Sequence, residues 1–316
     1  MKTMKWLIKR EFWEHKGMVL WAPAVVAGLI ALMTMGGLLM GRNVSFGGEG
    51  GGKLSVELGG QARDTVVAMI AEFYTLAAMP ILVMLGFLVF FYCLGALHDD
   101  RRDRSLLFWK SLPVSDLTTV LSKVALALVV LPLVAALVGI VLSLAIVLMA
   151  GASMALHGLN MFGPVMSSAS FYLSPLRLLG LLPVYMLWAL PTVGWLLLVS
   201  SWARSKVFLW AVGAPLVTAA LIAWTNKIFA LGMPQGWFME HIVSRILLGV
   251  APGSWFVFSR VNPQSLVREG ENHIQAADLF SASWGTLGNP ALWVGVAAGV
   301  AMIAGAVWLR RWREEG

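Results

Sequence analysis

The chain has 316 residues, of which 59% are hydrophobic and only 12% are charged. A soluble domain carries about 25% charged residues, so this composition excludes an ordinary water-soluble enzyme or binding module. The single cysteine, Cys93, excludes a disulfide framework and any metal site built from several cysteines. The formal net charge is +7, and its distribution decides between nucleic acid and a membrane surface as the partner.

Six apolar runs without charged residues are each long enough to cross about 30 Å of hydrocarbon. They are Val19–Met40, Leu76–Leu97, Val124–Ala150, Leu178–Ser200, Val207–Thr225 and Ala291–Leu309. The sequence therefore predicts an all-α integral membrane protein with six transmembrane helices, in which residues 1–316 form a single transmembrane domain.

The basic residues are distributed unevenly between the two predicted sides of the membrane. With both termini inside, the inner segments are 1–18, 98–123, 201–206 and 310–316. They hold 15 of the 23 Lys and Arg residues, whereas the acidic residues divide equally, eight on each side. This positive-inside pattern predicts a multi-pass protein of the inner (cytoplasmic) membrane with both termini cytoplasmic. It also favours membrane lipids over nucleic acid as the partner of the basic groups.

The predicted external region, residues 226–290, contains one further apolar stretch, Trp237–Phe258. Its charged and turn residues are Glu240, His241, Arg245, Pro252 and Gly253. A seventh span here would move the basic cluster after residue 309 to the outside. We therefore expect a re-entrant or interfacial hairpin on the outer side, before the last span.

The first 18 residues interleave aromatic and basic side chains. The residues that define this pattern are Trp6, Arg10, Glu11 and Trp13. Such a pattern is typical of an amphipathic helix lying in the cytoplasmic interface, with an ordinary basic flank as the alternative. The apolar run that follows is too long for a signal peptide and lacks a small-residue cleavage site, so we expect a retained first span.

Two glycine-rich segments superficially resemble nucleotide-binding motifs: residues 47–54 a phosphate-binding loop, and residues 58–61 (LGGQ) the LSGGQ signature of ABC ATPases. Residues 47–54 read GGEGGGKL, but Leu54 replaces the hydroxyl that would hold Mg²⁺, and the segment is predicted to be external. The histidines are scattered and no helix presents paired carboxylates, so we expect neither a catalytic nor a metal site in this chain. The spans also lack the ionisable groups that ion-coupled transporters normally need.

The cytoplasmic loop His98–Lys123 carries the strongest functional signal. In chain order it contains a charged cluster at 99–104, an apolar run at 106–109, a break at 110–113 and a capping residue, Ser115 or Asp116. A short apolar helix pointing into water is suited to insertion into a groove of another protein. Alternatively, Phe108 and Trp109 lie back on the membrane as an anchor.

This loop contains the charged cluster, then RSLLFWKSLPVS, and then a Lys at the start of span three. That order resembles the corresponding loop in the permease subunit of ABC-2 type ATP-binding-cassette exporters. In that family this loop forms the coupling helix that docks on the cytoplasmic ATPase subunit. The N-terminal WLIKREFWEHKG is similar to the family's connecting helix, although Arg104-Ser105 replaces the Gly-Thr of many members. By this resemblance the ATPase-coupling residues are Asp99, Asp100, Arg101, Arg102, Arg104, Leu106, Leu107, Phe108, Trp109, Lys110, Pro113 and Ser115.

The resemblance implies a permease subunit that moves a hydrophobic or amphipathic substrate across or out of the membrane. Its partners would be two copies of an ABC ATPase, which bind the ATP and Mg²⁺, and a second permease copy in a homodimer. This chain itself would bind no cofactor. The spacing of Gly295 and Gly299 also permits close packing between helices of two copies. Two alternatives remain: an intramembrane lipid- or peptide-processing enzyme built around Glu240 and His241, and a non-transporting membrane anchor or sensor.

Overall fold

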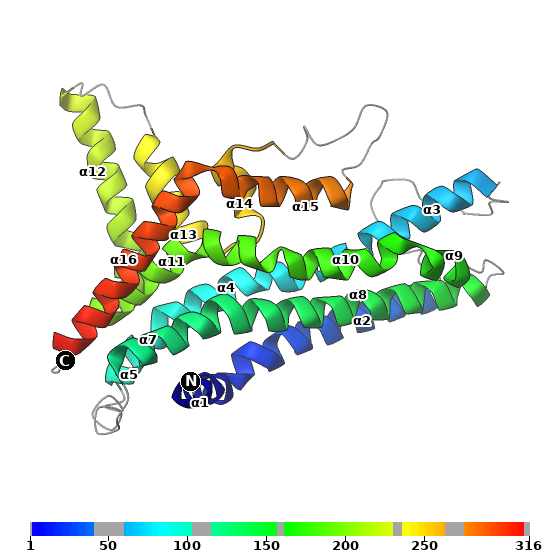
Figure 1. Cartoon of the computed structure of the whole chain (residues 1–316), viewed down its shortest axis with the longest axis horizontal. Helices are drawn as coiled ribbons and strands as arrows, with labels where there is room; N and C mark the ends of the chain where they lie inside the picture. Colours follow the sequence, from blue (N-terminus) through cyan, green and yellow to red (C-terminus); the bar gives the residue numbers. More distant parts are fainter. Residues whose placement is uncertain are drawn as a thin grey trace.

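The computed structural model describes residues 2–40, 60–102, 115–156, 161–229, 236–262 and 275–312, and every regular element within these ranges is a helix (Figure 1). In chain order the elements are α1 (Lys2–Glu14), η1 (Gly17–Trp21), α2 (Ala22–Leu39), α3 (Gly60–Phe73), η2 (Tyr74–Ala78), α4 (Met79–Ala96), α5 (His98–Arg102), α7 (Asp116–Ala125), η3 (Leu126–Val130), α8 (Leu131–Leu156), α9 (Phe162–Ser167), α10 (Ala169–Gly180), α11 (Leu182–Trp202), η4 (Leu209–Gly213), α12 (Ala214–Phe229), η5 (Met239–Val243), α13 (Ser244–Leu248), α14 (Ser254–Ser259), α15 (Ala276–Gly285), η7 (Thr286–Gly288) and α16 (Pro290–Trp312).

Six continuous helices are long and apolar enough to cross a membrane, which confirms the predicted number of spans. They run over Gly17–Leu39, Tyr74–Arg102, Asp116–Leu156, Ala169–Trp202, Leu209–Phe229 and Pro290–Trp312. The third helix has 41 residues and the fourth has 34, so both extend well past the predicted apolar cores. At 1.5 Å per residue the third is about 60 Å long, twice the thickness of the hydrocarbon layer. It must therefore tilt strongly, protrude from the bilayer, or both.

Three of these helices contain a wide π-helical turn, and in each the turn is followed closely by a proline. The prolines are Pro23 after η1, Pro132 after η3 and Pro215 after η4. Proline lacks an N–H and its ring clashes with the carbonyl four residues earlier. A π turn relieves this clash without ending the helix, which lets an apolar span contain proline and stay continuous.

Helix α11 is the centre of the bundle and α16 is its closest neighbour. The most apolar stretch of the span containing α11 is 61% buried, against 11% for the spans that contain α2 and α12. A Cβ atom on Gly194 of α11 would lie only 2.6 Å from the carbonyl oxygen of Gly299 on α16. Gly295 and Gly299 are both buried inside the same chain. Their spacing therefore serves packing within the subunit, contrary to the expectation that it pairs two copies.

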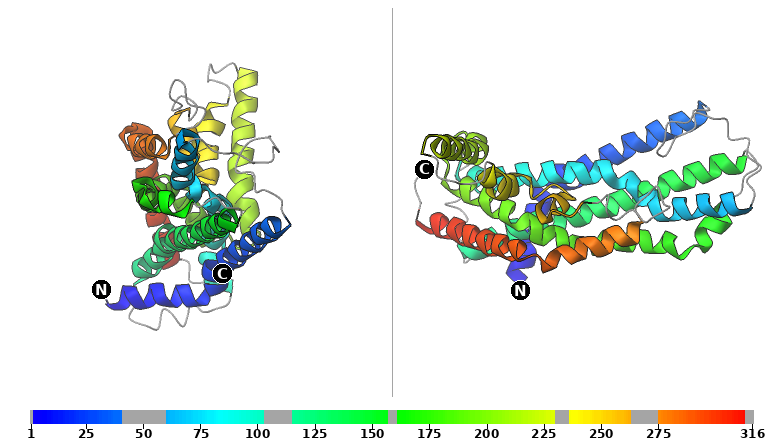
Figure 2. Two further views of the ribbon diagram at one scale, coloured as in Figure 1. Left: turned by 90° about the vertical axis from the view of Figure 1, so that its right-hand side faces the viewer. Right: turned by 90° about the horizontal axis from the view of Figure 1, so that it is seen from above.

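The two groups of spans do not run parallel. In Figure 1, α2, α4, α8 and α10 follow the long axis of the molecule, whereas α12 and α16 cross it steeply. The short helices α13 and α14 lie between these groups, and α15 runs above α10. A second small core joins α3, α9 and α10 to the far end of α8, around Tyr74 and Phe171. Both chain termini lie at the other end of the bundle, here called the terminal end (Figure 2).

Substitution of Gly194 by Ala tests the close crossing of α11 and α16. The new methyl group would meet backbone of α16, so the two helices must separate and lose contacts along the whole crossing. We expect a lower midpoint of thermal unfolding in detergent, measured by size-exclusion chromatography after heating. Gly28→Ala in α2 is the matched control, because nothing lies within 4 Å of a Cβ there; equal effects of the two changes would contradict the proposed crossing.

Candidate functional site: a buried charge cluster at the terminal end

Lys123 of α7 lies buried between two carboxylates at the terminal end of the bundle. Its Nζ atom is 3.1 Å from Oε1 of Glu11 on α1 and 3.3 Å from Oδ2 of Asp100 on α5. The side chains of Lys123 and Glu11 are only 2% and 1% exposed. Burying single charges costs several kcal/mol each, so this arrangement depends on mutual pairing. Lys123 therefore joins the N-terminal helix to the helices before and after residues 103–114.

Arg310, near the C-terminal end of α16, extends this cluster. Its Nη1 donates to Oδ2 of Asp100 at 3.1 Å, and its Nε donates to Oδ1 of Asp116 at 3.2 Å. The Arg310 side chain is 4% exposed. A guanidinium suits this position because its planar fork serves two carboxylates at once. Through Arg310 the end of the last span is fixed to the same carboxylate that pairs with Lys123.

Two further neighbours donate to the Glu11 carboxylate. The Tyr92 hydroxyl donates to Oε2 at 3.2 Å, and Nη2 of Arg10 donates to Oε1 at 3.1 Å. We call Arg10, Glu11, Tyr92, Asp100, Asp116, Lys123 and Arg310 the charge cluster. It contains three cations and three carboxylates, so its formal charge is zero.

Helix α5 is also tied to the end of α11. The Arg101 guanidinium donates to the carbonyl oxygens of Ser200 and Ala203 at 2.5 and 2.9 Å. The Ser200 hydroxyl in turn accepts from the backbone N–H groups of Leu97 and His98, both at 3.0 Å. A cation at unpaired carbonyls of a helix C-terminus is favourable, because that end of the helix dipole is negative.

The structure describes five of the twelve predicted coupling residues. Asp100 and Arg101 are held by the contacts above, whereas Asp99 lies beside His98 and, like Arg102, is exposed. Ser115, one of the two residues predicted for this role, caps α7: its Oγ accepts from the Thr118 N–H at 3.2 Å. The other predicted coupling residues lie outside the described residues: Arg104, Leu106, Leu107, Phe108, Trp109, Lys110 and Pro113.

Sequence reasoning missed the cluster itself. In the sequence, Lys123 contributes only to the positive-inside pattern and to the family resemblance, and Arg310 only to the positive-inside pattern. One signal was present: Asp116 and Lys123 are seven residues apart, two turns along one helix face, beside an otherwise apolar run. That spacing indicates a charged helix face, but no sequence pattern pairs it with Glu11 or Arg310, which are more than 100 residues away.

Helix α1 separates a buried face from an exposed aromatic face. Leu7 and Glu11 are buried, whereas Trp6 and Trp13 are 68% and 57% exposed. Lysine ammonium groups lie 5.4 and 6.0 Å from the centroids of these two rings. The exposed face thus combines rings with cations, as the sequence pattern suggested.

The hairpin between η5 and α14 packs against two spans. Gly249 lies against the carbonyl oxygen of Trp188 on α11, and the Tyr185 hydroxyl donates to the carbonyl of Val250 at 3.0 Å. On α4, a Cβ added to Gly86 would lie 3.2 Å from that same Val250 carbonyl. The chain reverses through Pro252 and Gly253, whose φ of +83° is a left-handed conformation that favours glycine.

Arg245 of α13 fastens this hairpin to the start of α16. Its Nη1 and Nη2 atoms donate to the carbonyls of Ala291 and Leu292 at 2.6 and 3.3 Å. The guanidinium carbon is 4.9 Å from the centroid of the Trp188 ring, which adds a cation–π contact. Burial lowers the pKa of Arg245 from its ordinary value, but a guanidinium remains charged at neutral pH.

Of the three ionisable residues in the first half of the hairpin, Glu240 and His241 come together and Arg245 lies apart from them. Glu240 and His241 both approach Arg260, at 3.9 and 3.3 Å, whereas Arg245 is engaged with the carbonyls of α16. His241 also stacks on Trp237, with ring centroids 5.3 Å apart. The described contacts therefore explain these side chains as structural partners.

Among the described residues, Glu11, Glu14 and His15 are close enough to share a metal ion, with ligand atoms within 4.8 Å of one another. Glu11 is already the partner of Lys123 and Arg10. The donor set fits the charge cluster better than a metal centre.

No family model, curated protein or solved structure matches this chain.

Replacing Lys123 by Met tests whether the cluster holds the bundle together. The change leaves Glu11 buried with less compensation and removes one partner of Asp100, so we expect a loss of about 3–5 kcal/mol in stability. The midpoint of thermal unfolding in lipid nanodiscs measures it. Adding Glu11→Gln should recover part of the loss because the unpaired charge is removed; additive losses in the double variant would contradict direct pairing. Lys16→Met on the exposed side is the control.

Replacing Arg245 by Gln tests the fastening of the hairpin. Gln is too short to reach both carbonyls of α16 while covering the Trp188 ring, so residues 239–259 should exchange amide hydrogens faster. Hydrogen exchange with mass spectrometry measures this directly. Arg260→Gln, on the exposed side of the hairpin, is the control and should change exchange less.

Proposed function

We propose that this chain is the membrane-spanning permease subunit of an ATP-driven ABC exporter. The observation that carries the proposal is the charge cluster, which fixes the residues on both sides of the segment 103–114. Asp100 precedes that segment, and Asp116 and Lys123 follow it. Lys123 pairs with Glu11 of the first helix, and Asp100 and Asp116 both pair with Arg310 of the last helix. A force applied to the segment would reach several spans through one rigid base.

The membrane placement follows from the same proposal. The terminal end faces the cytoplasm of a cell whose inner membrane holds the six spans. Helix α1 lies in the cytoplasmic interface, where its exposed tryptophans and lysines contact acyl chains and anionic headgroups. The hairpin Trp237–Phe258 enters from the outer side and turns back at Pro252-Gly253. Its backbone is compatible with that depth because spans α4 and α11 pack against it.

Energy comes from a separate subunit in this proposal. Two copies of a cytoplasmic ABC ATPase bind ATP and Mg²⁺ and dock on the residues around Leu106 to Trp109. Two permease copies form a homodimer, and the substrate is hydrophobic or amphipathic. Closure of the ATPases would push on the docking segment, and the charge cluster would convert that push into tilting of α1, α7 and α16.

A pull-down from native membranes in mild detergent tests the proposal. We expect the tagged chain to retain a soluble subunit in stoichiometric amount, and mass spectrometry should find a phosphate-binding loop and an ABC signature in it. Absence of any ATPase, under conditions in which the permease stays folded, would overturn the exporter function. Activity that is independent of ATP and lost on substitution of Glu240 would instead favour the enzyme. A partner without ATP hydrolysis would favour the sensor.

Leu106→Asp tests the docking segment itself. A carboxylate in an apolar interface cannot be buried without a partner, so the ATPase should be lost from the pull-down by at least tenfold while membrane insertion persists. Leu156→Asp is the control, because Leu156 is 88% exposed at the far end of α8. Equal retention of the ATPase by Leu106→Asp and the wild type would refute the docking assignment.

A further inference from the structure

The short helix α15 is held at its N-terminal end by a carboxylate from a distant part of the chain. Oε1 of Glu72, on α3, accepts a hydrogen bond from the backbone N–H of Ala276, the first residue of α15, at 2.8 Å. The same oxygen lies 3.9 Å from Nη1 of Arg177 on α10. The side chain of Gln275, at the N-cap position, makes no capping hydrogen bond. Glu72 therefore supplies the negative group that the start of a helix favours.

Two buried tryptophans hold the other end of this helix. Nε1 of Trp255, on α14 of the hairpin, donates to Oγ of Ser283 at 3.1 Å. Nε1 of Trp188, on α11, donates to Oγ1 of Thr286 in η7, also at 3.1 Å. Between its two ends α15 runs above α10 (Figure 1). This one helix therefore joins α3 and α10 to the hairpin.

Helix α15 depends on these attachments more than the spans depend on theirs. It has ten residues, fewer than the roughly 12 to 15 at which isolated helices become stable in water. All ten are described, and only Ser283 is buried. In the middle, the ring of Phe280 lies against Gly180 of α10, where an added Cβ would be 2.9 Å away. A short helix with so little burial opens at a lower free-energy cost than a span does.

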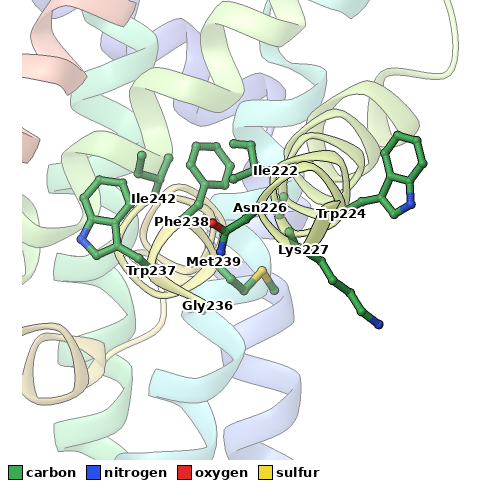
Figure 3. A pocket seen from close by; sticks show the side chains of 11 residues that line it. Ile222, Trp224, Asn226, Lys227, Gly236, Trp237, Phe238, Met239 and Ile242 are labelled. Atoms are coloured by element: carbon green, nitrogen blue, oxygen red, sulfur yellow. The ribbon is translucent and has the colours of Figure 1, made fainter. Parts of the chain in front are cut away.

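The hairpin is not closely packed on the side that faces α12. A cavity of about 720 Å³ lies there, between α12 and residues 236–242 (Figure 3). The α14 half of the hairpin is held from two other directions. On α11, the Trp188 ring stacks on Phe258 with centroids 5.9 Å apart, and on α15, Ser283 accepts from Trp255. Helix α15 is therefore one of the two supports of α14.

We propose that α15 is a releasable strap that holds the α14 half of the hairpin against α11, with the Glu72 carboxylate as its attachment point. Without the Glu72 contact, the first turn of a short helix loses its cap, so α15 opens as a unit. Trp255 then loses its partner at the other end of the strap. The hairpin stays attached through Arg245 and Tyr185, whereas α14 is free to move. The strap does not rest on the proposed permease function.

Hydrogen exchange with mass spectrometry, on the full chain in lipid nanodiscs, tests the strap. Glu72→Ala should raise the exchange rates of α15 and of residues 254–259 together by about fivefold, the effect of losing one helix cap. Tyr74→Phe is the control, because it removes a different hydrogen bond to α10, from the Tyr74 hydroxyl to the Phe171 carbonyl, and keeps the ring. Faster exchange confined to the first turn of α15 would overturn the proposal, as would equal effects of the two variants.

Ser283→Ala tests the strap from its other end. It removes the acceptor of the Trp255 indole, and alanine favours helix, so faster exchange would not come from helix propensity. Because coupling between two sites is reciprocal, residues 276–280 should exchange faster together with 254–259. Glu72→Gln keeps an oxygen acceptor for the Ala276 N–H and should give a smaller increase at both ends, which serves as the test if Glu72→Ala does not fold. Variants that each change only their own end of α15 would overturn the strap.

Discussion

The ammonium group of Lys123, 2% exposed between Glu11 and Asp100, is the contact on which the terminal end of this protein depends. The three side chains come from three helices, and Asp100 also pairs with Arg310 of a fourth helix, α16. Lys123 begins an apolar span, where an unpaired charge would be strongly unfavourable. Pairing therefore compensates these buried charges, and it ties α1, α5, α7 and α16 together at one point.

The region around the hairpin is built on different interactions. There the hairpin is held by backbone carbonyls that accept from Tyr185, Thr192 and Arg245, and by glycines that allow close approach to α4 and α11. Helix α12 takes little part in this packing, and it leaves a cavity beside the hairpin. Ion pairs therefore hold the helices together at the terminal end, whereas α12 is only loosely packed beside the hairpin.

Continuity of the helices links the terminal end to the far end of α8. The spans containing Pro23, Pro132 and Pro215 stay unbroken because a π turn precedes each proline. The 41-residue helix from Asp116 to Leu156 runs from the charge cluster to the small second core at the far end. One continuous helix therefore joins the charge cluster to the second core.

The sequence by itself determined the helical class, the six spans and a cap at Ser115 or Asp116, because apolar run length and capping are local properties. It also marked the positions of α1 and the hairpin, through the aromatic–basic pattern around Trp6 and Trp13 and the break at Pro252-Gly253. Only the tertiary structure decided that Lys123, Glu11, Asp100 and Arg310 form one cluster, that Arg245 binds α16, and that Gly295 and Gly299 pack within the chain. Each of these depends on which helix faces come together over large sequence separations, and helical periodicity places a residue on a face without naming the face opposite.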